Sequence, residues 1–275
     1  EMCIRDRFKV ICGLYETLGI PKTELNNLIP FAAIATVGDV MELQDENRII
    51  VREGLMRLQN PENKGLKALI RVNNLEEKTI TAYHIGFILG PCMNASGRLS
   101  TAKRALNLLL TEDEKEASIL AEDLKALNDS RKDMTAKGVE QAIEMVENTD
   151  LAKDRVLVIY LPDCHESLAG IIAGRIRERY TKPVFVLTKG EEGVKGSGRS
   201  IETYHMFQEM VKCKELFTKF GGHPMAAGLS MEEENIEKLR RRLNENCTLT
   251  QEDMTEKIVI DVVITMSYVT IPFIR

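Results

Sequence analysis

Apolar residues in the first part of the chain recur every three to four positions, which is the period of an amphipathic helix. This spacing predicts helices over residues 8–18, 46–57 and 64–72, and Gly19-Ile20-Pro21 ends the first of them. Residues 1–7 have alternating charge and no such period. They are interpreted as a truncation scar or a misassembled end and are left out of the predicted fold.

Two segments of the first part have a less regular pattern. Residues 31–37 form a continuous run of small apolar residues that ends at Gly38-Asp39, and this run fits a buried strand as well as a buried helix. Residues 81–89 lead into a segment over 90–99 that is punctuated by glycine and proline, a composition typical of turns.

A long helix is predicted in the middle of the chain. Thr111 and Glu114 have the spacing of a capping box, and residues 112–147 then run without proline. The apolar stripe is narrow, and Gly138 interrupts the helix once. Such a helix suits a connector between two domains better than a core helix, so we place the boundary at residues 148–153.

The second half of the chain has the pattern of a βαβ unit. Residues 155–160 and 183–187 are apolar runs of strand length, and a helix is predicted between them over 167–180. This order predicts a small α/β domain with a mostly parallel or mixed sheet. A charged helix is expected over 232–246, and residues 257–269 are expected to begin a new strand-rich element.

Composition limits the class of protein. The chain has 275 residues, of which 44% are hydrophobic, with 37 Lys and Arg against 42 Asp and Glu, as is usual for a globular protein of two domains. No apolar stretch approaches the length needed to span a bilayer, and no charged and then apolar leader opens the sequence. The six cysteines contain no CxxC pair, which argues against structural zinc and favours a reducing, cytoplasmic location.

Two glycine-rich segments are the strongest candidates for chemistry. Residues 194–200 place glycines beside Arg199 and two serines, and residues 220–228 contain Gly221-Gly222-His223 before a run of small residues. Glycine lets a backbone approach an anion closely, and a guanidinium can bind two phosphate oxygens. Either segment alone fits a turn with a structural histidine equally well, but together they favour a phosphate site.

The distribution of charged residues along the chain agrees with a phosphate site. Residues 152–230 contain 12 Lys and Arg against 9 Asp and Glu, so the part of the chain with the glycine-rich segments is the basic part. A surplus this small is also common on a solvated surface.

Other polar residues are weaker candidates. Asp39 is interpreted as a metal ligand at a sheet edge or, more commonly for an Asp beside a glycine, as a turn or cap residue. Asn94 and Arg98 suggest a second polar cluster, although Arg98 has the alternative of pairing with Asp123. His165 follows the first predicted strand, where ligands bind in open α/β sheets. The remaining histidines, His84 and His205, are taken as structural.

Six segments in this order resemble the RecJ single-strand-specific DNA exonucleases of the DHH phosphoesterase superfamily. They are residues 35–43, Asn47-Arg48, 93–99, Cys164-His165-Glu166 with 170–173, 196–200 and 220–228. The resemblance implies a 5′→3′ exonuclease on single-stranded DNA in DNA repair and recombination, which uses two manganese or magnesium ions. Single-strand-binding protein or a helicase is the implied protein partner.

The resemblance also implies a domain arrangement. Residues 8–110 correspond to the C-terminal part of the DHH domain, 111–148 to the connecting helix and 152–248 to the DHH-associated substrate-binding domain. Residues 255–275 correspond to the start of an oligonucleotide-binding barrel.

Site residues follow from the same motifs. Asp39 matches a metal-ligand aspartate, and Arg199 and His223 match catalytic residues that hold nucleotide phosphates beside the metals. The implied substrate-binding residues around them are Ser197, Gly198, Ser200, Gly221, Gly222, Asn94, Arg98 and His165.

The sequence also departs from the family pattern. It lacks the Asp-His-His triplet and the earlier Asp-rich segments, and Cys164 and Glu166 replace the usual residues. We therefore expect an internal fragment of a longer nuclease, and one that is inactive alone, because one carboxylate cannot hold two hard cations. A phosphoesterase for short oligonucleotides or nucleotides and a non-catalytic nucleic-acid-binding module are the alternative functions.

Overall fold

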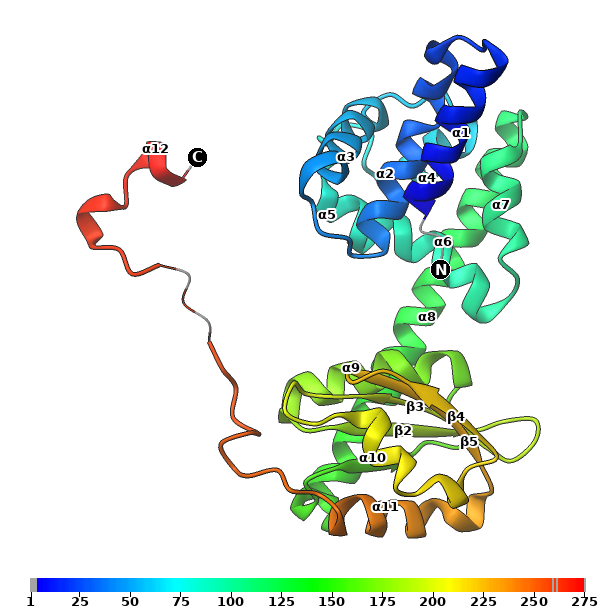
Figure 1. Cartoon of the computed structure of the whole chain (residues 1–275). Helices are drawn as coiled ribbons and strands as arrows, with labels where there is room; N and C mark the ends of the chain where they lie inside the picture. Colours follow the sequence, from blue (N-terminus) through cyan, green and yellow to red (C-terminus); the bar gives the residue numbers. More distant parts are fainter. Residues whose placement is uncertain (1–3, 259, 261, 275) are drawn as a thin grey trace. The chain divides into compact units, whose positions relative to one another are not determined.

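The computed structural model describes residues 4–258, 260 and 262–274 of the chain. The chain divides into two compact units, residues 1–136 and 137–275, and the division falls within one long helix (Figure 1). Each unit is described by itself below.

The first unit is helical. Its helices are α1 (Ile4–Leu18), α2 (Ile29–Gly38), α3 (Asp45–Leu58), α4 (Lys64–Val72), α5 (Ala82–His84), α6 (Gly90–Leu99), α7 (Lys103–Leu110) and the first part of α8 (Glu114–Asn148). The ambiguous run over 31–37 belongs to α2, which packs on α3. A Cβ built at Gly54 would stand 2.2 Å from the Ala33 Cβ, so the small residues let the two helices approach closely.

Two expectations for this unit are wrong. The segment over 90–99 is helix α6, which continues from α5 and the π-helical turn Ile85–Leu89 and has Pro91 in its first turn. Helix α1 begins at Ile4, so part of the segment over residues 1–7, for which no element is predicted, is helical as well.

Helix α8 confirms the predicted long helix, but its N-terminus is capped differently. The Asp113 carboxylate accepts hydrogen bonds from the amides of Lys115 and Glu116 at 2.7 and 3.1 Å, while Thr111 pairs with the Glu116 side chain. The interior Gly138 serves packing, since a Cβ there would stand 2.6 Å from the Ile172 Cδ1 atom of α9 (Ala169–Tyr180).

The second unit is built on a five-stranded mixed sheet. Its strands are β1 (Leu157–Tyr160), β2 (Val184–Lys189), β3 (Val194–Arg199), β4 (Lys219–Gly222) and β5 (Ala226–Met231). The strand order is β1-β2-β3-β5-β4, with β1 and β2 parallel and the other pairs antiparallel. The predicted βαβ unit and the α/β fold class are therefore confirmed.

Helices cover both faces of this sheet (Figure 1). Helix α9 packs on β2 and β3, whereas α10 (Met206–Val211) contacts β4 and β5 and α11 (Ile236–Glu245) contacts β1. The apolar core between the sheet and the latter two helices includes Phe185, Met206 and Leu239, all fully buried.

Two further expectations for this unit need correction. The glycine-rich segments around residues 196–200 and 220–228 are mainly antiparallel strands, since β5 pairs with β3 on one side and forms a hairpin with β4 on the other. The strand-rich element expected over 257–269 is not seen, since the described residues between 255 and 274 form no strand and include α12 (Ile271–Ile274).

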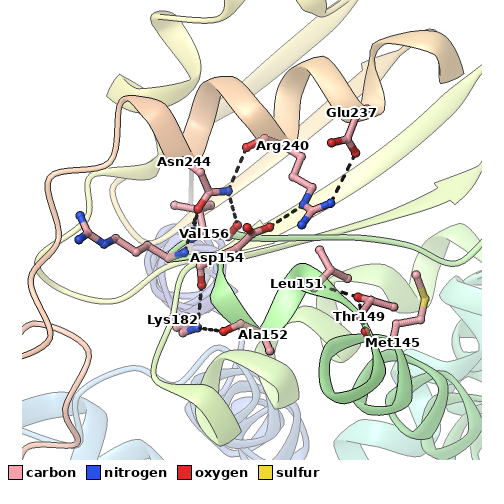
Figure 2. Close-up of polar contacts among 11 residues, drawn as sticks. Met145, Thr149, Leu151, Ala152, Asp154, Val156, Lys182, Glu237, Arg240 and Asn244 are labelled. Atoms are coloured by element: carbon pink, nitrogen blue, oxygen red, sulfur yellow. Dashed lines mark hydrogen bonds and ion pairs between the residues drawn. The ribbon is translucent and has the colours of Figure 1, made fainter.

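Polar contacts connect the start of β1 to α11 (Figure 2). The Asn244 amide oxygen accepts from the backbone N–H groups of Arg155 and Val156 at 2.8 and 3.0 Å, and Arg240 Nε donates to Asp154 Oδ2 at 2.6 Å. Lys182 Nζ donates to the Asp154 carbonyl at 2.6 Å, so side chains of α11 and of the segment before β2 hold this corner of the sheet.

Candidate phosphate-binding groove

The candidate site lies on one face of the sheet formed by β3, β5 and β4. Built Cβ atoms at Gly196 and Gly198 would meet the core side chains of Leu187 and Met206 at 2.4 Å, so these two positions face the core. Because side chains alternate along a strand, Ser197 and Arg199 face the opposite side.

Three small residues lie in a row across this face. Ser197 on β3 is paired with Gly228 on β5, and Gly228 is paired with Gly221 on β4. A Cβ built at Gly221 would meet no atom within 4 Å, and one at Gly228 would meet only the Gly196 carbonyl at 4.0 Å. The floor of the face is therefore low enough for a ligand to approach the backbone closely.

A groove of about 370 Å³ lies over this row. Its lining consists of Glu166, Ser167, Lys195, Gly196, Ser197, Lys219, Phe220, Gly228, Leu229 and Ser230. Two of these residues are cations and one is an anion, and both serines of the sheet face bring a hydroxyl group. Such a lining suits a small anionic ligand better than an apolar one.

Arg199 lies at the end of β3 and is packed against α9. Its Nη1 group donates to the Gly198 carbonyl at 2.8 Å, and a Cβ built at Gly170 would stand 2.8 Å from its Nη2 atom. The glycine in the first turn of α9 therefore makes room for the guanidinium on the side of the sheet where Ser197 points.

His223 begins the turn between β4 and β5. Its backbone N–H donates to the Ala226 carbonyl at 2.7 Å, and its side chain is exposed. A Cβ at Gly222 would stand 2.5 Å from the Ala226 carbonyl oxygen, so the tight turn requires glycine there. The turn thus presents an imidazole next to the edge strand of the groove.

Three other residues that the resemblance implies for substrate binding do not line the groove. Gly198 faces the core, and Ser200 is buried and donates its hydroxyl to the Tyr204 carbonyl at 2.6 Å. His165 Nδ1 lies 2.7 Å from Ser167 Oγ and accepts from the Ser167 amide at 3.3 Å, so this histidine caps the short helical turn Glu166–Leu168 beside the groove.

Sequence reasoning missed the charged residues of the groove. Lys195 Nζ lies 2.7 Å from Glu166 Oε2, and this carboxylate raises the pKa of Lys195. Lys195 and Lys219 are both in register with Ser230. The available signal was the period of two along β3, which places Lys195 on the same face as Ser197 and Arg199.

The histidines taken as structural have that role in the structure. His84 Nδ1 accepts from the Thr81 amide at 3.1 Å, and His205 Nδ1 accepts from the Gln208 amide at 3.3 Å. Both rings cap helices.

The remaining predicted site residues belong to the first unit. Asp39 is exposed at the C-terminus of α2, so it ends a helix and does not lie at a sheet edge. Asn94 and Arg98 are exposed one turn apart on α6. The predicted alternative partner of Arg98, Asp123, is 3.4 Å from Arg104.

The described part of the chain does not fit a two-metal centre. Among these residues no group of three or more His, Cys, Asp or Glu side chains could hold a metal ion. Two hard cations need several carboxylate ligands, and Asp39 supplies only one. No helix among the described residues is long and apolar enough to cross a membrane.

The chain is similar in sequence and in structure to several known proteins. RecJ of Bacillus subtilis (strain 168), a single-stranded-DNA-specific exonuclease, is 38% identical over 250 residues, which are 90% of this chain and 32% of that protein. The chain thus spans less than half the length of this relative. The crystal structure of RecJ from Thermus thermophilus with Mg²⁺ matches with a TM-score of 0.75 and 30% identity, over 84% of this chain and 36% of that one.

A second solved structure, exonuclease RecJ bound to manganese, matches with a TM-score of 0.76 and 31% identity, over 86% of this chain and 58% of that one. Residues 153–248, which contain the sheet and the groove, match the DHHA1 domain. The chain is therefore homologous over most of its length to the RecJ single-stranded-DNA-specific exonucleases, and its second unit contains their DHHA1 domain.

Proposed function

We propose that the groove over Ser197, Gly228 and Gly221 holds a phosphate of single-stranded DNA, and that this chain is the substrate-binding part of a 5′→3′ exonuclease. The observation that carries the proposal is the low row of small residues, because Arg199 and His223 lie on either side of Ala226 at the end of the sheet next to this row. A phosphate needs both close approach and positive charge, and this face combines the two.

The chemical step requires groups that the described residues lack. In the proposed whole enzyme, manganese or magnesium ions supply the activated water and the charge stabilisation for phosphodiester hydrolysis. Because the described residues do not fit that centre, we expect this polypeptide to bind DNA without cleaving it. Manganese-dependent digestion of single-stranded DNA by this chain alone would contradict the proposal.

The binding step is tested by fluorescence-anisotropy titration with a 5′-phosphorylated single-stranded oligonucleotide. We expect Arg199→Ala and His223→Ala each to weaken binding, because each removes a group that faces the phosphate, while His205→Ala leaves it unchanged. Binding that falls with added salt, with a smaller slope in the Arg199 variant, would support phosphate contact. Equal affinity of all variants would refute the proposed groove.

A phosphoesterase for short oligonucleotides is the alternative enzyme. A length series separates the two functions, because a preference for dinucleotides over long strands in a full-length enzyme would favour the phosphoesterase. The similarity to RecJ favours the exonuclease, and a role in DNA repair and recombination, together with single-strand-binding protein or a helicase as partner, forms part of the same proposal.

A further inference from the structure

A second row of residues crosses the same sheet face two positions from Ser197, Gly228 and Gly221. Lys195 on β3 is paired with Ser230 on β5, and Ser230 is paired with Lys219 on β4. All three residues line the groove. Because neighbouring strands are about 5 Å apart, the two lysine backbones are about 10 Å apart, and their long side chains can converge on one anion above the Ser230 hydroxyl group.

The distance between the two rows suits successive phosphates. Two residues along an antiparallel strand advance about 7 Å, close to the separation of neighbouring phosphates in an extended single strand. A ligand phosphate held at Ser197 therefore brings the next phosphate of the same strand over Ser230, if the strand runs along β5.

The ion pair in the groove leaves this row available to an anion. Lys195 and Glu166 are 44% and 43% exposed, and a pair this open to solvent is held only weakly, so a phosphate can compete with the Glu166 carboxylate. Lys219 is exposed and has no ion pair among the residues that the structure describes. The groove thus contains two lysine side chains and one carboxylate, that of Glu166, which a phosphate can displace.

We propose that Lys195, Ser230 and Lys219 form a second phosphate subsite, which holds the phosphate adjacent to the one at Ser197, Gly228 and Gly221. The inference rests on the proposed function, since it assigns a second contact to the same strand of nucleic acid. It predicts that the groove distinguishes ligands with two phosphates from ligands with one.

The test is isothermal titration calorimetry of the whole chain with two probes, thymidine 5′-monophosphate and the 5′-phosphorylated thymidine dinucleotide. We expect Lys195→Ala and Lys219→Ala each to weaken dinucleotide binding about three- to five-fold, as for exposed charge contacts, and to leave mononucleotide binding unchanged. Lys189→Ala is the matched control, since Lys189 is an exposed lysine on β2 in register with the core-facing Val194.

Glu166→Gln provides a variant with the opposite expected effect. It removes the competing carboxylate and should tighten dinucleotide binding about two-fold, a gain that a damaged fold would not produce. If the lysine variants weaken both probes equally, or neither, or if Glu166→Gln weakens the dinucleotide, the second subsite is wrong. If Arg199→Ala binds both probes as tightly as the unchanged chain, the proposed function itself fails.

Discussion

Replacing Asn244 by alanine tests how the structure holds β1 to α11. The Asn244 side chain accepts from the amides of Arg155 and Val156, and its Nδ2 group donates to the Val156 carbonyl at 2.9 Å (Figure 2). Val156 is fully buried, so water cannot replace these partners at that residue. The substitution therefore leaves a buried donor and a buried acceptor unpaired.

The expected loss of stability follows from those groups. An unsatisfied buried N–H group costs about 1–3 kcal/mol, and the buried carbonyl adds about 1 kcal/mol. The Arg155 amide is exposed, so it can form a hydrogen bond to water instead, at little cost in free energy. Alanine gains about 0.5 kcal/mol over asparagine in helix propensity, so we expect Asn244→Ala to lower the free energy of unfolding by about 2–3 kcal/mol.

Urea unfolding followed by circular dichroism, with hydrogen exchange at β1 as the local readout, measures this loss. Arg241→Ala is the control, because Arg241 is exposed on the same helix, and its effect should stay within about 0.5 kcal/mol. Asn244→Asp keeps the acceptor for both amides and should lose less than Asn244→Ala. A loss for Asn244→Ala no larger than that of the control would refute the reasoning.

Three further predictions concern single substitutions at buried or closely packed positions. Gly170→Ala should push the Arg199 guanidinium aside, since the built Cβ stands 2.8 Å from Nη2, and should weaken oligonucleotide binding in anisotropy titrations without lowering the melting temperature. Tyr204→Phe should preserve or raise stability in urea unfolding, because the buried Tyr204 hydroxyl has no hydrogen-bond partner among the residues that the structure describes, and burial raises its pKa. Gly65→Ala should destabilise the first unit by about 3 kcal/mol or more in the same assay, because its Cβ would stand 1.9 Å from the Leu108 carbonyl oxygen.

The fold was predictable from sequence where the apolar pattern has a clear period. The βαβ unit and α8 follow from such patterns. The structure of the segment over 31–37 does not follow from its pattern. Helix α2 is apolar on nearly every side, and a buried helix of that kind shows no hydrophobic period. The glycine-rich sequences of β3, β4 and β5 predict turns and not strands, and the pairing of β3 with β5 joins residues some thirty positions apart.

The candidate site was predictable only in part, for a similar reason. Ser197, Arg199 and Gly221 belong to recognisable motifs, and the structure brings Ser197 and Gly221 into one row. Lys219 enters the groove only through the register of β4 with β5, which no local pattern reveals. Ser200 shares its motif with Arg199 but is buried, because alternation along the chain turns it into the core.

The central claim is that a nucleic-acid phosphate binds over the row of small residues in the second unit. Amide NMR of the whole chain, titrated with a 5′-phosphorylated single-stranded oligonucleotide, tests it most directly. The account predicts the largest chemical-shift changes at Ser197, Gly221 and Gly228, with little change at the fully buried core of α11 around Leu239 and Leu243. Saturable binding that leaves those three amides unmoved would contradict it.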